Sequence, residues 1–491
     1  MPTTPNARQI ALLLILSAAT VLVHGFHPYA EDGEIYVPGI KHALNPALYP
    51  QNTDFFMSHA RMTIFPHLVA GSVRITPLSW DWALFLWHFG SIFLFLLACW
   101  QIGRLAFREP LAAWGGATLV ASLLTIPVAG TALYIMDQYL TTRALSTPAT
   151  LFILVNAIER RWARAGLWLL FTATIHPLMV VFALSYAVVF LWFDRGGVPA
   201  TAPLSEASSA AFLFPLGLFP PVTDAYREIL QSRPYFFLLR WEWYEWLGIF
   251  APLLLLGWFA RIARQQDLPV LERLCRVTTW FGLMFFVAGL VLTVPDRFAN
   301  LAELQPMRCL QLVYILLFIF AGGLLAQFVL KRAAWRWLVL LVPICAGMFY
   351  AQRELFPATA HVEWPGVQSR NPWVQAFVWI RDHTPPDAFF ALDPNHMLAP
   401  GEDQHGFRAI AERSRLADRV KDSGVVSMFP RLAETWRNQV RALDGWKDFK
   451  AEDFARLKRA YGVNWVIVEK RVAPPLACPY QNSAVLVCRL D

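Results

Sequence analysis

Charged residues are scarce in this 491-residue chain: they make up 16% of it, whereas 56% of its residues are apolar. The mean hydropathy is +0.42, while in a soluble globular chain roughly a quarter of the residues are charged. A soluble enzyme, a coiled coil and a disordered chain are therefore excluded. The apolar residues form long unbroken runs without the period-two alternation of a transmembrane β-barrel, so the sequence predicts an α-helical polytopic membrane protein.

Basic runs and cysteines are also few. No Lys/Arg run is long enough to follow a phosphate backbone, so the net charge of +7 does not indicate a nucleic-acid partner. Six cysteines are too few for a disulfide scaffold. Residues 360–491 hold 34 of the 77 charged residues, which predicts a transmembrane domain over 1–355 and a soluble α/β domain over 356–491.

The apolar runs predict about eleven transmembrane helices. The two runs on either side of His176 and Pro177 are expected to form either a tight hairpin or one kinked helix. All eleven runs follow in chain order: 10–26, 82–102, 112–130, 145–158, 166–176, 178–193, 208–221, 246–262, 277–294, 307–330 and 336–350.

The distribution of basic residues predicts the orientation. With a cytoplasmic N-terminus, the inner loops hold 14 Lys/Arg and the much longer outer loops hold eight. An odd number of helices then places the C-terminal domain on the periplasmic or extracellular side. The longest loop, 27–80, falls on that outer side together with Asp137, His176, Asp296 and Glu303.

The outer loop opens with three carboxylates within four residues, Glu31, Asp32 and Glu34. Clustered carboxylates raise one another's pKa, so that one can accept a proton as a catalytic base. Asp32 and Glu31 are the expected ligands of a divalent cation, if the reaction uses one. The alternative is a solvated acidic loop without a catalytic role.

This loop and several later segments resemble the type C (GT-C) glycosyltransferase superfamily, which includes the protein mannosyltransferases and the lipid A aminoarabinose transferases. The motifs that carry the resemblance are the acidic pair Glu31-Asp32, a Tyr-Pro…Asp element ending at Asp54, and the segments 137–148, 176–177, 305–308 and 379–394. The acidic group reads Glu-Asp-Gly-Glu and not Asp-Glu or Asp-x-Asp, which leaves open which carboxylate is the base.

Members of this superfamily are polytopic enzymes that take a sugar from a polyprenyl-phosphate carrier at the outer face of the membrane. The resemblance therefore implies a bacterial inner-membrane location, a lipid-linked sugar as donor, and a glycan, lipid or protein as acceptor. It also implies the site residues, with Asp32, Glu31 and Glu34 as catalytic groups and Asp54, Asp137, Arg143, His176 and Arg308 as substrate-binding groups.

Several of these substrate-binding residues have a simpler interpretation. Arg143 and Arg308 suit a lipid phosphate, but arginines at helix ends also extend toward the headgroups. Asp137 is either a site residue or the ion-pair partner of Arg143. His176 is either a site residue or a capping residue.

In the C-terminal domain, periodicity predicts helices at 371–383, 430–443 and 451–460 and strands at 389–392, 464–469 and 484–488. A polar cluster in this domain is expected to form a solvated surface, and the alternative is that it binds an acceptor or a phosphate. Its members are Asp403, His405, Arg408, Arg413, Arg415 and Lys421. Cys478 and Cys488 flank a turn-rich stretch and are expected to form a disulfide, with two buried thiols as the alternative.

The sequence thus predicts a membrane glycosyltransferase. The alternative is a non-catalytic polytopic protein, either a carrier of lipid-linked glycan or a scaffold for envelope assembly. A carrier is expected to place its ionisable groups near mid-span and to contain internal repeats. The ionisable groups here lie at the outer ends of the predicted helices, which favours the enzyme.

Overall fold

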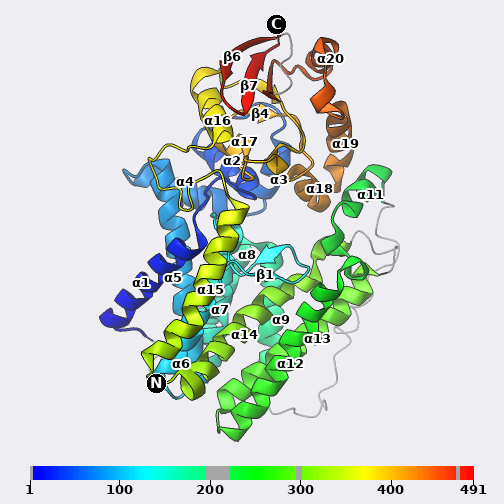
Figure 1. The fold of residues 1–491 in the computed structure, drawn as a ribbon. Helices are drawn as coiled ribbons and strands as arrows, with labels where there is room; N and C mark the ends of the chain where they lie inside the picture. The colour runs from blue at the N-terminus through cyan, green and yellow to red at the C-terminus, as the bar shows by residue number, and fades with distance from the viewer. Residues whose placement is uncertain (1–3, 195–221, 295–300, 471–475, 491) are drawn as a thin grey trace.

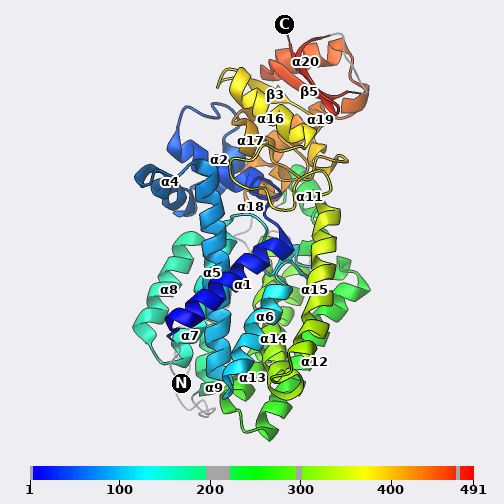
Figure 2. The ribbon, with the colours of Figure 1, turned by 60° about the vertical axis from the view of Figure 1, so that its left-hand side comes forward.

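The structure, a computed structural model, describes residues 4–194, 222–294, 301–470 and 476–490. Long helices form a bundle at one end of the molecule, and a domain of helices and strands forms the other end (Figure 1). The two views agree that the helices of the outer loop, α2 (Gly33–Leu44), α3 (Asp54–Ala60) and α4 (Phe65–Ile75), lie between these ends (Figures 1 and 2).

Within the described residues, helices cover ten of the eleven predicted apolar runs, and the run at 208–221 lies outside those residues. α14 continues into a π-helix over Leu325–Leu330. The bundle helices are α1 (Ala7–His24), α5 (Trp80–Ala106), α6 (Pro110–Ser122), α7 (Thr142–Ile158), α8 (Trp162–Ile175), α9 (Pro177–Asp194), α12 (Trp243–Gln265), α13 (Pro269–Thr293), α14 (Leu310–Leu324) and α15 (Ala334–Leu355).

Six helices of the described residues are long and apolar enough to cross a membrane, so the predicted number of about eleven is not confirmed. They are α1, α5, α12, α13, the 301–330 segment that contains α14, and α15. The most apolar part of α15 has no residue buried inside the molecule, and Leu338, Val339 and Val342 are exposed. Because exposing so much apolar surface to water is unfavourable, these helices are suited to contact lipid.

The structure corrects one expectation about the bundle and decides another. The run 112–130 does not remain helical to its end: α6 ends at Ser122, and the chain forms a short hairpin of β1 (Pro127–Val128) and β2 (Leu133–Tyr134). Pro127 lacks the N–H that a helix requires, and the turn residue Gly130 has a φ of 60°. The runs around His176 form two separate helices, α8 and α9.

The C-terminal domain contains a five-stranded mixed sheet in the order β4-β3-β5-β7-β6, in which β3 is parallel to β4 and β5 and the other pairs are antiparallel. The apolar side chains of α16 pack with one set of strand residues, and those of α20 pack with the alternate set. The strands are β3 (Phe389–Ala391), β4 (Ser414–Arg415), β5 (Trp465–Glu469), β6 (Ala477–Gln481) and β7 (Val485–Arg489).

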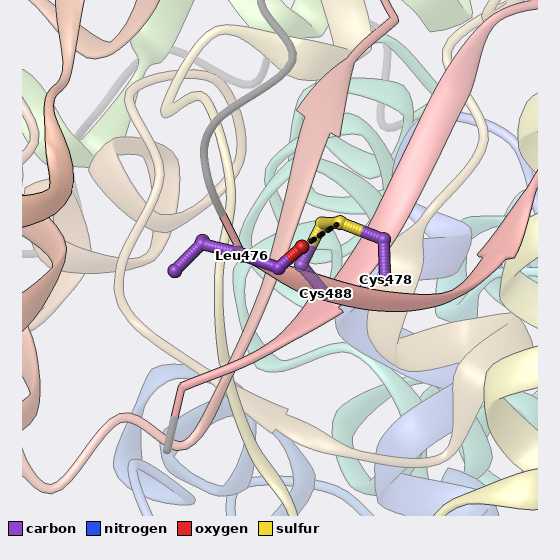
Figure 3. The surroundings of a disulfide bond; sticks show 3 residues. All are labelled: Leu476, Cys478 and Cys488. Carbon is purple, nitrogen blue, oxygen red and sulfur yellow. Dashed lines mark hydrogen bonds between the residues drawn. A yellow bond between two sulfur atoms is a disulfide. The ribbon is translucent and has the colours of Figure 1, made fainter.

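All three helices and all three strands predicted in this domain are confirmed within a few residues: α16 (Pro372–His383), α19 (Ala433–Ala442), α20 (Ala451–Tyr461), β3, β5 and β7. The disulfide is also confirmed. Cys478 in β6 and Cys488 in β7 are bonded across the antiparallel pair, with their Cα atoms 3.9 Å apart (Figure 3). β4, β6 and two short helices, α17 (Phe407–Ala411) and α18 (Asp422–Met428), were not expected from the sequence.

Candidate functional site

The acidic loop passes directly beneath the C-terminal domain. After α1 ends, the His27 amide donates to the Gln138 carbonyl at 2.9 Å, and the Glu31 amide donates to the Gln404 carbonyl at 2.8 Å. Glu31 has a φ of 54°, in the left-handed region that residues with a side chain rarely adopt. The backbone is thus held in a strained conformation at the first carboxylate of the group.

A cavity of about 810 Å³ opens beside this loop. Its wall combines the acidic loop, the β1–β2 hairpin, the start of α7, the N-terminal parts of α12 and α14, and a loop of the C-terminal domain. The charged side chains on the wall are Glu31, Asp32, Asp137, Arg143, Arg233, Glu245, Arg308 and Lys421. Five of the eight predicted site residues therefore line one space: Glu31, Asp32, Asp137, Arg143 and Arg308.

Arg143 joins two of the carboxylates. It is the second residue of α7, whose first turn is capped by the Thr141 hydroxyl. Its Nη2 atom lies 2.9 Å from Asp32 Oδ2 and 2.9 Å from Asp137 Oδ2, and its Nε donates to Asp137 Oδ2 at 3.2 Å. The interpretation of Asp137 as the partner of Arg143 is confirmed, and that pairing lies within the cavity wall.

Lys421 brings a second cation to the acidic pair from the C-terminal domain. Its ammonium group donates to Glu31 and also to Asp32 Oδ1, the latter at 3.2 Å. Burial alone would raise the pKa of Asp32, but the charges of Lys421 and Arg143 lower it well below its ordinary value. The expectation that clustering raises the carboxyl pKa values is therefore wrong for Asp32, which stays ionised and accepts hydrogen bonds.

Arg233 and Arg308 differ from the other two cations because neither forms a salt bridge within the described residues. Arg308 lies in a short 3-10 helix, Pro306–Cys309, between the left-handed residue Gln305 and α14, and its buried Nε has no hydrogen-bond acceptor among the described residues. Arg233 Nη2 donates to the Val420 carbonyl at 2.6 Å and to the Ser423 hydroxyl. Without a salt-bridge partner in the described part of the chain, these two guanidinium groups are suited to bind an anion.

Glu34 lies outside the cavity lining and is fully buried. Its Oε1 accepts from Arg408 at 3.2 Å and from Arg415 at 2.9 Å. These arginines also pair with Asp422 and Asp418 of the C-terminal domain. The geometry indicates that Glu34 attaches the acidic loop to that domain and has a structural role, not a catalytic one.

Two further predicted site residues also lie outside the cavity lining. Asp54 begins α3, is exposed, and lies 3.7 Å from Arg61. His176 is the residue between α8 and α9, and its amide caps α8 by donating to the Thr172 carbonyl at 2.8 Å. This cap involves only the backbone, so the site role of the His176 side chain stays a prediction.

The cluster of polar residues in the C-terminal domain is not a solvated surface. Five of its members are buried, and only Lys421 is partly exposed: Asp403, His405, Arg408, Arg413 and Arg415 are the buried ones. Arg408 and Arg415 contact Glu34 of the acidic loop, whereas Asp403, His405 and Arg413 bond to other segments. The sequence suggested Lys421 as a possible phosphate ligand and did not predict its contact with Glu31. The two residues are 390 positions apart, so no local sequence pattern indicates their contact.

The residues of the acidic pair do not fit a divalent cation. Mg²⁺ and Ca²⁺ need free carboxylate oxygens at about 2.0–2.6 Å. Both oxygens of Asp32 already accept from cations, and Glu31 is bonded to Lys421. Within the described residues, no group of three or more His, Cys, Asp or Glu side chains is placed to hold a metal ion.

No family model matches this sequence, and no curated protein is similar to it. Among solved structures, the chain is similar to the archaeal oligosaccharyltransferase AglB from Archaeoglobus fulgidus, in complex with an inhibitory peptide and a dolichol-phosphate. The sequence identity is 12% and the TM-score is 0.48, over 94% of this chain and 69% of AglB.

Proposed function

We propose that this protein is a membrane glycosyltransferase that moves a sugar from a polyprenyl-phosphate carrier to an acceptor. The observation that carries the proposal is the composition of the cavity wall. Two carboxyl side chains, Asp32 and Asp137, line the same space as two guanidinium groups, Arg233 and Arg308, that have no carboxylate partner within the described residues. A glycosyl phosphate needs both kinds of group, one toward the acceptor and one toward the phosphate.

The carboxylates and the arginines of the cavity have different roles in the proposal. In the proposed transfer, the bond between the sugar's anomeric carbon and the phosphate oxygen breaks, and the acceptor oxygen bonds to that carbon. The departing phosphate keeps the bonding electrons, and Arg308 and Arg233 compensate its charge. Asp32 accepts a hydrogen bond from the acceptor and orients it, and the acceptor's proton passes to an oxygen of the departing phosphate as the new bond forms. Because the phosphate is a good leaving group, no general acid is needed.

The apolar part of the wall fits a lipid-linked donor. Pro127, Val128, Ala129 and Gly248 line the cavity next to the aromatic rings of Tyr244 and Tyr314. This stretch belongs to the hairpin and to helices of the bundle, so a polyprenyl chain can approach along apolar side chains while its phosphate reaches Arg308. The basic residues of the loops support an orientation with the cavity and the C-terminal domain on the outer side of a bacterial inner membrane.

The test compares two substitutions in the purified full-length protein. Asp32→Asn removes the carboxylate that orients the acceptor, so the transfer rate from a panel of polyprenyl-phosphate sugars should fall by about 10²-fold or more. Arg308→Ala removes a charge-assisted contact, so binding of a polyprenyl phosphate without sugar should weaken by roughly 10-fold or more. Asp224→Asn, an exposed substitution in the first turn of α11 (Asp224–Gln231), is the matched control for both.

The two measurements separate the enzyme from its alternative. Wild-type transfer by Asp32→Asn would contradict the role of the carboxylate. Specific binding of polyprenyl phosphate by a wild-type protein that transfers none of the sugars would instead support a carrier of lipid-linked glycan. Unchanged lipid binding by Arg308→Ala would place the phosphate elsewhere.

A further inference from the structure

The acidic pair of the cavity has a cation built into the chain. Lys421 Nζ contacts Glu31 and Asp32, and Arg143 contacts the other oxygen of Asp32. A divalent cation on these carboxylates would have to displace Lys421. We propose that the Lys421 ammonium group permanently fills the place of a divalent cation at the acidic pair, so that the site acts without a metal. This inference deepens the proposed function by naming what holds its carboxylates.

The position of Lys421 is fixed by its backbone. Its amide donates to Asp418 Oδ1 at 2.6 Å, at the residue before α18, and the next amide, of Asp422, donates to the same oxygen at 3.0 Å. Asp418 and Asp422 are in turn paired with Arg415 and Arg408 in the buried network. The side chain of Lys421 therefore starts from a rigid point and is only 12% exposed.

The charges of the cavity also favour a monovalent partner. Lys421 and Arg143 together compensate Glu31 and Asp32, while Asp137 shares Arg143. The ammonium group thus neutralises the pair and leaves both carboxylates as hydrogen-bond acceptors. Without Lys421, two adjacent carboxylates would share one guanidinium group, and their repulsion would create a demand for another cation.

The decisive experiment titrates the full-length protein with Mn²⁺ alone and follows free Mn²⁺ by electron paramagnetic resonance. The wild type and Lys421→Arg, which retains the charge, should leave the signal of free Mn²⁺ unchanged. Lys421→Met should take up about one Mn²⁺ per chain with a dissociation constant of roughly 10⁻⁴–10⁻³ M. Adding Asp32→Asn to Lys421→Met should remove this uptake, which would locate the ion at the acidic pair.

Each outcome bears on the inference. Mn²⁺ uptake by the wild type that Asp32→Asn abolishes would overturn it, and so would a folded Lys421→Met protein that takes up none. Gel filtration and the unfolding temperature establish folding, and Lys421→Gln replaces Lys421→Met if that variant does not fold. Because no sugar donor is present, a failure of the proposed transfer leaves these results interpretable. Where transfer is observed, the wild-type rate should be unchanged by EDTA, and an EDTA-sensitive rate restored by Mn²⁺ would also overturn the inference.

Discussion

Replacing His405 should change how the stability of the protein depends on pH. Glu363 Oε1 accepts from His27 Nδ1 at 2.8 Å and from His405 Nε2 at 3.1 Å, while His405 Nδ1 lies 3.0 Å from the Glu402 carbonyl oxygen. Both nitrogens of His405 thus face acceptors, and only the protonated imidazolium can donate to both. This buried group joins the end of α1 to the C-terminal domain.

The magnitude follows from the pKa of His405. Burial lowers this pKa, but the Glu363 carboxylate more than offsets it, so that it rises from 6.5 to about 9. A raised pKa means that the folded protein holds this proton more tightly than the unfolded chain. The stabilisation is therefore fully present below pH 6.5 and is lost as the pH rises to about 9, and it amounts to about 3 kcal/mol. The lowered pKa of Glu363, about 2, reflects the same interaction and is not counted again.

The assay is the apparent unfolding temperature of the full-length protein in detergent, measured between about pH 6 and pH 9.5. Because the unfolding entropy of a chain of this size is about 1 kcal/mol/K, the wild type should lose on the order of 3 °C across this window. His405→Gln cannot carry the charge, so it should be less stable than the wild type at pH 6 and should lose less as the pH rises. Burial also raises the pKa of Glu402, which adds a slope of the same sign to both proteins. Equal losses in the two proteins would refute the assigned charge of His405.

Two more substitutions or fusions test other parts of the structure. In the buried network, three carboxylates (Glu34, Asp418 and Asp422) face two arginines. Glu34→Gln should therefore lower the free energy of unfolding by less than about 2 kcal/mol and retain transfer, whereas Arg415→Met should lower it by about 3–5 kcal/mol. Denaturant unfolding decides this, and a larger loss for Glu34→Gln would contradict the charge count. Alkaline phosphatase fused to the C-terminus should be active in cells if that domain faces outward. An inactive phosphatase fusion together with an active cytoplasmic reporter would reverse the proposed orientation.

The C-terminal domain was predictable because its signals are local. α16 and β5 follow from the spacing of apolar residues, and each occurs within one residue of its predicted bounds. The disulfide was predictable because ten residues separate Cys478 and Cys488 around a turn. In the bundle, the same reasoning extended α6 into the β1–β2 hairpin, because an apolar run does not reveal where a chain leaves its helix to line a cavity.

The residues that the acidic loop and the bundle contribute to the candidate site were predictable. The contribution of the C-terminal domain, Lys421, was not. Asp32, Asp137, Arg143 and Arg308 lie where helices begin or loops leave the bundle, and this regular position made them candidates. Their charges, however, are assigned by contacts that the sequence does not encode locally. Glu34 stands two residues from Asp32, yet one side chain points into a buried network and the other into the cavity wall.

This division explains why the acidic loop and the C-terminal domain are best regarded as one site. Asp32 stays ionised in its buried position because cations compensate its charge, and Lys421 supplies part of that compensation from the residue before α18. Glu34 holds the loop against the same segment through Arg408 and Arg415. The domain that carries the sheet is therefore not an appendage to a membrane site: it fixes both the position and the charge of the carboxylate on which the proposed chemistry depends.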